Sequence, residues 1–460
     1  MQTLNHMREE VKQQVLEHLL SDCSDEEAIE KIDTLLRENP QVKSLELGGS
    51  ELGAQGGRRI GMVLQSNQTV TSIGLNENDF GPNDCITIVA ALKTNETLTA
   101  ISLSFNKLGS ATVAQLAEIL KTNKTLRSIA LSENDLGPND GVAIAEALKI
   151  NNTLIAIDLS GANLGVEGAI TIAEALQINQ SLRSIIISFH VLGTKGATAI
   201  AEALKHNRTL KSINLMLNEL GPEGAKVIAG ALKFNRTLTS IYFNLNDLGP
   251  EAAALIAEAL KINRTLTSIY LGDNKLGDSG VAVIAEALQT NKSLTSIDFG
   301  SNKFGSQGAT AIAQALKINE NLCSMGLMMN KLGRQGATDI AEALIANRTL
   351  TSIDLRQNQL DETDVDALVE ALAQNKVLTK LQSESKVRDR VNPYLQRNRN
   401  MKRQGCLTLL ALRHNRRGLW AAISKDVLQL IVRQAFPEIV GENQVKYPMN
   451  SVSPSGVSFT

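Results

Sequence analysis

The sequence is poor in aromatic side chains, because its 460 residues include only 9 Phe, 4 Tyr and 1 Trp. Since 43% of the residues are nevertheless hydrophobic, we expect a core built from aliphatic side chains. The four cysteines, Cys23, Cys85, Cys323 and Cys406, lie far apart and share no metal-ligand spacing. We therefore expect no disulfide framework, no metal and no cofactor, and a reducing compartment is the simplest interpretation.

Long hydrophobic runs and a strong net charge are missing as well. No run of 18 apolar residues exists, so no transmembrane segment is predicted. The first residues, MQTLNHMREEVKQQ, lack the apolar stretch of a signal peptide. With 46 Lys+Arg against 48 Asp+Glu, the net charge of −2 argues against a wholly basic nucleic-acid-binding protein. We expect a cytoplasmic protein, or one secreted without a Sec signal.

The chain contains an internal repeat with a period of 28 residues and no insertion. The first half of a typical unit, LTSIYLGDNKLG, alternates like a short strand with one buried face. The second half, GVAVIAEAL, has apolar residues and alanines at helical spacing. One unit cannot bury its own apolar face, so the repeats must stack into an α/β solenoid. The twelve units begin at Val42, Val70, Leu98, Leu126, Leu154, Leu182, Leu210, Leu238, Leu266, Leu294, Leu322 and Leu350.

Three polar or small positions recur within the repeat, counted from its first residue. Position 9 is Asn in nine units, where a side-chain amide can satisfy backbone groups of neighbouring turns. Ser50, Ala162 and His190 replace it in the others, and local distortion is expected there. Position 12 is Gly in eleven units, which predicts a turn with positive φ. Position 26 is Asn in all twelve, which predicts that a left-handed residue ends each helix.

These motifs resemble leucine-rich repeats of the ribonuclease-inhibitor subtype over residues 42–377. The resemblance implies a horseshoe-shaped solenoid with a concave parallel β-sheet, convex α-helices and a protein-binding concave face. Residues 1–41 are predicted to form an N-terminal helical cap. Residues 378–440 are predicted to hold a half-repeat and a basic helical region, with helices over 385–403 and 405–436. Residues 441–460 are predicted to be a disordered tail.

A candidate partner-binding surface lies where the repeat is free to vary, at positions 5, 7 and 8. Most units carry small or acidic residues there, but between Leu182 and Gly272 these positions become apolar. Two of the four tyrosines occupy position 5 of adjacent units, and tyrosine is favoured at interface hot spots. The predicted partner-binding residues are Ile186, Phe189, His190, Met216, Leu217, Tyr242, Leu245 and Tyr270.

Simpler interpretations compete with this one. Apolar residues at position 8 could tuck under the following turn, which would explain Leu217 and Leu245. His190 is explained more simply as a substituted ladder asparagine than as a functional residue. Neither argument accounts for the two tyrosines. The same face carries acidic residues, which predicts a partner with a basic rim around an apolar centre; they are Glu133, Asp158, Asp273, Asp298 and Asp354.

The region after the repeats has the opposite charge. Between Lys380 and Arg417 there are eleven Lys/Arg against Glu384 and Asp389, a net of +9, so the remainder carries −11. One interpretation is a cap helix docked against acidic repeat faces, and another is a site for an anionic membrane. Missing aromatic residues argue against nucleic acid. The predicted basic patch comprises Arg397, Arg399, Lys402, Arg403, Arg413, Arg416 and Arg417.

No catalytic motif stands out, so no catalytic residue is assigned and a non-enzymatic protein-binding scaffold is the leading hypothesis. The stretch NPYLQRNR resembles the C-terminal regions of leucine-rich-repeat effectors that intracellular bacteria inject, which implies a role in host cytosol. ISKDVLQLIVRQAF resembles an F-box helix without its leading Leu-Pro, which implies a ubiquitin-ligase adaptor binding a ligase subunit. A GTPase-activating protein is the third alternative, because one such family shares this repeat subtype.

Overall fold

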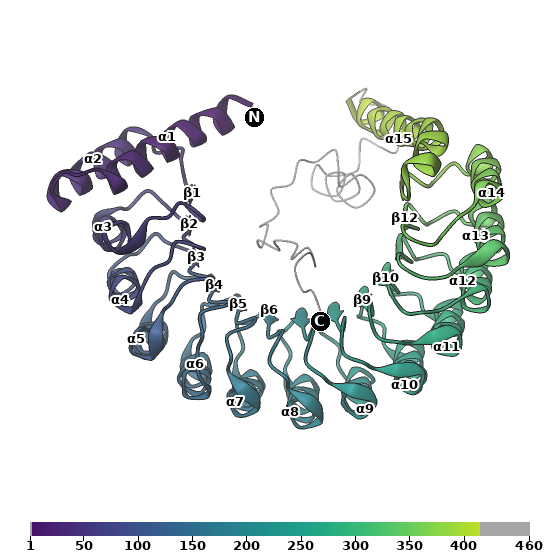
Figure 1. Ribbon diagram of the computed structural model, residues 1–460, viewed down its shortest axis with the longest axis horizontal. Coiled ribbons are helices and arrows are strands. Elements are labelled where there is room, and N and C mark those ends of the chain that lie inside the picture. The colour runs from purple at the N-terminus through teal and green to yellow at the C-terminus, as the bar shows by residue number, and fades with distance from the viewer. Residues whose placement is uncertain (1, 415–460) are drawn as a thin grey trace, which may run out of the picture.

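The computed structural model describes the backbone of residues 2–414 and the side chains of residues 6–404. The described residues form an open, curved array with the strands on the inner side and the helices outside (Figure 1). This arrangement confirms the predicted horseshoe. The predicted disordered tail, and the part of the predicted helix 405–436 that follows His414, lie outside the described residues.

The strands form one parallel sheet in which neighbours in sequence are neighbours in space. Each strand occupies repeat positions 3–5, and the register advances by one repeat, as in Tyr242 opposite Tyr270. The last strand comes from the half-repeat that follows residue 377. The strands are β1 Ser44–Glu46, β2 Ser72–Gly74, β3 Ala100–Ser102, β4 Ser128–Ala130, β5 Ala156–Asp158, β6 Ser184–Ile186, β7 Ser212–Asn214, β8 Ser240–Tyr242, β9 Ser268–Tyr270, β10 Ser296–Asp298, β11 Ser324–Gly326, β12 Ser352–Asp354 and β13 Lys380–Gln382.

The helices alternate with the strands and pack side by side on the convex side (Figure 1). Two precede the first strand and one follows the last. They are α1 Gln2–Leu20, α2 Asp25–Glu38, α3 Gly53–Ser66, α4 Pro82–Ala91, α5 Gly109–Thr122, α6 Pro138–Ile150, α7 Gly165–Ile178, α8 Gly193–His206, α9 Gly221–Leu232, α10 Gly249–Ile262, α11 Gly277–Thr290, α12 Ser306–Ile318, α13 Gly333–Ala346, α14 Glu362–Gln374 and α15 Ser385–His414.

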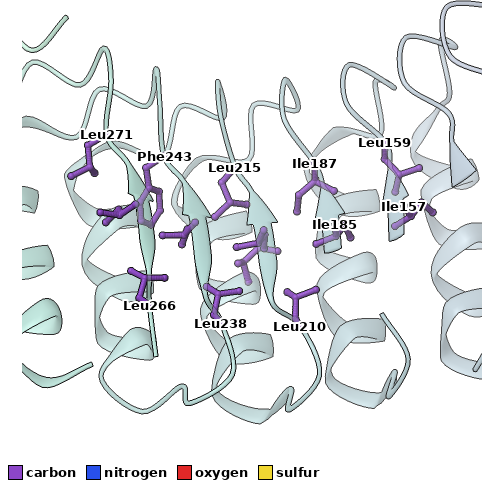
Figure 2. Close-up of a cluster of buried hydrophobic side chains, with 14 of the residues drawn as sticks. Ile157, Leu159, Ile185, Ile187, Leu210, Leu215, Leu238, Phe243, Leu266 and Leu271 are labelled. Carbon is purple, nitrogen blue, oxygen red and sulfur yellow. The ribbon is translucent and has the colours of Figure 1, made fainter. Parts of the chain in front are cut away.

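The core is a set of columns that run along the solenoid. Leu210, Leu238 and Leu266 occupy the same repeat position and lie one beside the next, as Figure 2 shows. Leu215, Phe243 and Leu271 form a parallel column (Figure 2). All six are fully buried. Since each repeat covers the apolar face of the one before it, stability is shared between neighbours and the two open ends need caps.

The asparagines at position 26 are not left-handed, so the predicted left-handed helix end is wrong. They form a ladder of side-chain hydrogen bonds between repeats, in addition to the ladder at position 9. In the ten helices that end directly at this asparagine, φ lies between −75° and −61° and ψ between 125° and 135°. From Asn95 to Asn375 the amide nitrogen instead donates to a leucine carbonyl of the preceding repeat. The amide oxygen accepts from backbone nitrogens two and three residues later, as in Asn207 with Thr209 and Leu210. Asparagine is used here for its side chain, not for its backbone freedom.

The glycines at position 12 adopt two conformations. Eight have the predicted positive φ, and five of these donate their N–H to a position-9 asparagine carbonyl of the next repeat. Gly81, Gly137 and Gly305 depart from the prediction, with φ of −80°, −93° and −108°. In these three the N–H is taken by an aspartate side chain, for example Asp84 Oδ2 at 3.0 Å from Gly81. The carboxylate is three residues away for Gly81 and Gly137 and comes from Asp278 of the preceding repeat for Gly305. It replaces the bond to the next repeat and removes the need for a left-handed residue.

The N-terminal cap is fastened by Arg59, which the sequence analysis overlooked. Its side chain is fully buried, and its guanidinium donates to the carbonyl oxygens of His18, Leu19 and Ser21 at 2.9–3.1 Å. Its Nε also pairs with Asp25 Oδ1 at 2.9 Å. The terminal carbonyls of α1 have no partner within their own helix. Arg59 satisfies them and so joins α1, α2 and the first repeat.

Candidate protein-binding surface

The concave sheet carries a stacked pair of tyrosines at its centre. Tyr242 and Tyr270 are the last residues of β8 and β9, and strand register places them opposite each other. Their ring centroids are 4.2 Å apart and the rings are parallel to within 1°. Each ring covers one face of the other and leaves both half-buried. Burial, aided by Tyr242, raises the pKa of Tyr270 to about 12, so its hydroxyl is a neutral hydrogen-bond donor at neutral pH.

The predicted apolar surface separates into two rows. Ile186, Met216 and the tyrosines face the concave side, but Asn214 stands between Ile186 and Tyr242 in the sheet. Asn214 accepts a bond from the Met216 N–H at 2.9 Å. Asn214 is therefore a polar residue that interrupts the apolar surface. The sequence analysis did not include it.

The second row runs along the edge where strands lead into helices. Phe189, Leu217 and Leu245 have left-handed backbones, with φ of 66°, 53° and 58°. Their N–H groups still donate to carbonyls of the next repeat, so the backbone is held in place. Phe189 and Leu245 are each 40% exposed, whereas Leu217 is half-buried. The alternative that Leu245 tucks under the following turn is therefore wrong.

His190 does not belong to the surface, contrary to its place among the predicted partner-binding residues. It is buried, and its Nε2 lies 2.8 Å from the Leu159 carbonyl oxygen. A position-9 asparagine makes the same contact elsewhere, as in Asn218 with Ile187. Burial lowers the pKa of His190, and its Nδ1 has no partner among the described residues. The simpler interpretation, a substituted ladder asparagine, is the one the structure shows.

Carboxylates flank the tyrosines on both sides. Burial raises the pKa of Asp158 and of Glu133 in repeats four and five, and Asp158 raises that of Glu133 further. On the other side, burial and the charge of Asp298 raise the pKa of Asp273, while burial and the charge of Asp354 raise that of Asp298. Asp354 itself is paired with Arg356 at 2.6 Å. The surface thus has a half-buried aromatic centre between two incompletely neutralised acidic groups.

The basic residues after the repeats have mainly structural contacts where they are described. Arg397 donates to the carbonyl oxygens of Leu372, Ala373 and Asn375, at the end of α14. Arg399 donates to the Thr379 carbonyl. Asn398, between them, donates to Asn375 and Leu378 and extends the second asparagine ladder into α15.

The remaining basic residues after the repeats differ in their contacts and exposure. Arg390 pairs with Asp366 of α14 at 2.6 Å, as expected of a cap helix docked on an acidic repeat face. Arg403 is exposed. Lys402 is half-exposed and interacts with another group of the protein. The side chain of Arg413 and the whole of Arg416 and Arg417 lie outside the described part. α15 runs without the predicted break near residue 404.

The described part of the chain shows neither a metal-binding cluster nor a membrane-spanning helix. Within it, no three His, Cys, Asp or Glu side chains gather closely enough to hold a metal ion. None of the helices described there is long and apolar enough to cross a membrane.

Comparison with known proteins agrees with this geometry. The model of the Leucine Rich repeat family matches eight segments, at residues 122–145, 151–173, 179–201, 206–229, 234–257, 263–285, 290–313 and 346–369. The chain is a leucine-rich-repeat protein. Each matched segment of this leucine-rich-repeat protein covers one strand and most of the helix that follows it. A search of curated proteins found no significant match.

Several solved structures are distantly similar to this chain. The actin-binding site 2 of leiomodin-1 is 21% identical, with a TM-score of 0.30 over 40% of this chain and 94% of that one. The leucine-rich-repeat protein LegL7 of Legionella pneumophila is 16% identical, with a TM-score of 0.40 over 77% and 98%. The yeast Rad7–Elc1 complex gives 13% identity and a TM-score of 0.49 over 83% and 91%. Likenesses this distant do not bear on the function of this leucine-rich-repeat protein.

Proposed function

We propose that this protein is a non-enzymatic scaffold that binds a protein partner on the concave face of repeats six to nine. The stacked pair Tyr242–Tyr270 carries the proposal. A rigid aromatic pair offers a large contact area and loses little conformational freedom on binding. The pair stands on a sheet whose other exposed positions are mostly small or acidic.

The partner's chemistry follows from the surroundings of the pair. Glu133, Asp158, Asp273 and Asp298 lie to either side without a salt-bridge partner among the described residues. A partner that places Lys or Arg on both sides of an apolar or planar centre would complement them. Phe189 and Leu245 on the adjoining edge would widen the apolar contact.

We place this partner in a eukaryotic cytosol and treat the chain as a bacterial effector. This part of the proposal rests on the resemblance of NPYLQRNR to injected effectors. The ribonuclease-inhibitor subtype is likewise inferred from the 28-residue repeat that contains a full helix. Affinity capture from eukaryotic and bacterial cytosol, side by side, tests the assignment. A partner present only in bacterial cytosol would contradict it.

The binding surface itself is tested with Tyr242→Ala combined with Tyr270→Ala. We expect the pair of changes to weaken binding of the captured partner by about 2 kcal/mol or more, the scale of interface hot spots. The melting temperature should change little, because neither ring is part of the fully buried core. Isothermal titration with the purified partner measures the loss.

Two control variants sharpen the test. Tyr242→Phe with Tyr270→Phe keeps the stack and removes only the hydroxyls, so it should retain most of the affinity. Phe105→Asn removes an exposed aromatic from repeat three, outside the proposed surface, and should have no effect. Unchanged binding by the double alanine variant would sink the concave-surface proposal.

A further inference from the structure

Another row of exposed apolar side chains lies at the edge where the helices end, at repeat position 25. The row has five members. Four of them are the last residues of their helices, and the fifth, Phe234, follows the end of α9 by two residues. Their exposed fractions range from 48% to 68%, the largest being that of Phe234. The row belongs to repeats four to ten and consists of Ile150, Ile178, Phe234, Ile262 and Ile318.

About half or more of each of these apolar side chains stays exposed. Where position 25 holds a hydroxyl, as in Thr94, Thr122 and Thr290, the hydroxyl donates to a carbonyl three residues earlier at 3.2–3.4 Å. Isoleucine and phenylalanine forgo that bond and place apolar surface in water instead. Burial of apolar surface is favourable, so the row is explained by something that covers it.

The same edge of the solenoid carries unpaired positive charge. Position 27, two residues further on, is Lys or Arg in seven of the twelve repeats and Glu in two, which gives a net of +5. None of the seven has a carboxylate within salt-bridge distance in the described part, whereas nearby position-24 lysines are paired, as Lys261 is with Glu286. The seven are Lys124, Arg208, Arg236, Arg264, Lys292, Arg348 and Lys376. Cations also complement helix C-termini, which accounts for part of this charge but not for the apolar row.

The opposite edge has a mixed charge with a small acidic excess. Position 10, in the turns that lead from strand to helix, is acidic in five repeats and Lys in four, and position 14 holds three glutamates and one Lys, which gives a net of −3. The acidic residues are Glu51, Asp79, Asp135, Glu219, Asp247, Glu167, Glu223 and Glu251, and the basic residues are Lys107, Lys195, Lys275, Lys303 and Lys331. The horseshoe therefore has one basic flat side with apolar tips and an opposite flat side of mixed charge.

The basic side extends along the curve of the horseshoe. Figure 1 looks down the shortest axis of the molecule, so the two flat sides face toward and away from the viewer. Neighbouring helices pack about 10 Å apart, so the row from Ile150 to Ile318 spans roughly 60 Å. A protein interface concentrates its apolar contacts in one desolvated centre. Separate apolar tips among cations on a flat side suit the headgroup region of a lipid bilayer.

We propose that this basic flat side of repeats four to ten docks on an anionic membrane surface. The five apolar tips insert among the lipid headgroups, and the position-27 cations face the acidic lipids. The strands then stand across the membrane plane, so the concave tyrosines stay open to a partner. The inference is independent of the proposed function, because it uses none of the concave residues.

The test is co-sedimentation of the full chain with vesicles of phosphatidylcholine, with or without phosphatidylserine. Wild type should pellet only with the phosphatidylserine vesicles, and less so at high salt. Ile178→Thr, Phe234→Thr and Ile262→Thr together replace three tips with the residue found at this position in other repeats. Arg208→Gln, Arg236→Gln and Arg264→Gln together remove three charges. Each triple variant should bind about tenfold or more weakly.

Matched changes on the opposite flat side provide the control. Phe105→Asn with Met329→Asn removes two exposed apolar residues there, and Lys303→Gln with Lys331→Gln removes two charges. Both should leave vesicle binding unchanged. Three results would overturn the proposal. They are no binding by wild type, binding that survives both triple variants and so belongs to the basic C-terminal region, or binding of polyglutamate in place of vesicles.

Discussion

Asparagine is the residue on which this fold depends most. A ladder at position 26 connects every pair of neighbouring repeats, and another at position 9 is interrupted at Ala162; the asparagines of both are buried. A buried amide that loses its partners costs the full desolvation of the groups left behind. The ladders also explain the N-x-[ST] triplets, because the residue after next donates its N–H to the asparagine oxygen. These asparagines are buried and so are not accessible acceptors for glycosylation.

Two adjacent asparagines allow this role to be measured. Asn151 donates to the Leu120 carbonyl at 2.6 Å and accepts from the N–H groups of Thr153 and Leu154. Asn152 is exposed. We expect Asn151→Ala to lower the free energy of unfolding by about 3 kcal/mol, the sum of several net hydrogen bonds, and Asn152→Ala to change it by less than about 0.5 kcal/mol. Urea titration followed by circular dichroism measures both, and equal effects would refute a ladder role.

At the scale of elements, each end of the solenoid is closed by a helix and an arginine. Arg59 binds the last carbonyls of α1, and Arg397 binds those of α14. Both place a cation at a helix C-terminus, where the helix dipole favours it. The basic region after the repeats is, in its described part, largely committed to this closure.

Arg58 and Arg59 offer a comparison within one salt-bridge cluster. Both pair with Asp25, but the Arg58 side chain is exposed and that of Arg59 is fully buried. Arg59→Ala should destabilise the cap by about 3 kcal/mol or more, because it leaves several carbonyls unsatisfied. Arg58→Ala should cost less than about 1 kcal/mol. Hydrogen exchange of the α1 amides reports the difference, and slow exchange retained in the Arg59 variant would contradict the assignment.

At the scale of the whole molecule, charge is distributed unevenly over three surfaces. The concave face is acidic around an aromatic pair, one flat side has a mixed charge with a small acidic excess, and the other is basic with apolar tips. The near-zero net charge of −2 hides this arrangement. Long-range fields depend on such local distributions and not on the total.

Binding of a basic partner to the concave face should weaken as the pH falls from neutral to mildly acidic. The pKa values of Glu133, Asp158, Asp273 and Asp298 are raised, so these carboxylates take up protons earlier than ordinary ones and lose their attraction for the partner. The same shifts do not destabilise the fold in that range. A carboxyl whose pKa is higher in the folded state binds its proton more tightly there, so acidification through the folded pKa favours folding.

Titration calorimetry at several pH values checks this prediction. Asp158→Asn with Asp298→Asn is the matched variant, since Asn214 shows that an asparagine makes the same bond to the position-7 N–H. The variant should bind more weakly at neutral pH and show a flatter pH dependence. His190 affects stability in the opposite direction. Its lowered pKa means that acidification favours the unfolded state, so unfolding must be followed in parallel.

The sequence by itself determined the repeat, the sheet and the concave position of the tyrosines. A strict 28-residue period leaves one way to stack units that cannot bury their own faces, and strand periodicity then sets which residues point inward. It could not show that the tyrosines stack, that Leu245 is exposed or that His190 is buried. Those outcomes depend on contacts with neighbouring repeats.

The tertiary structure alone decided what the asparagines, glycines and arginines do. Position 26 is compatible with a left-handed helix end by residue type, yet the amide is used to reach a carbonyl 31 residues earlier, as in Asn207 with Leu176. Gly305 and Gly333 have similar local sequences, but Gly305 donates its N–H to Asp278 of the preceding repeat and is extended, whereas Gly333 has a positive φ. Arg59 lies in α3, whereas its hydrogen-bond partners lie in α1, just after α1 and in α2. Hydrogen-bond partners distant in sequence are set by stacking, so the local pattern could not supply them.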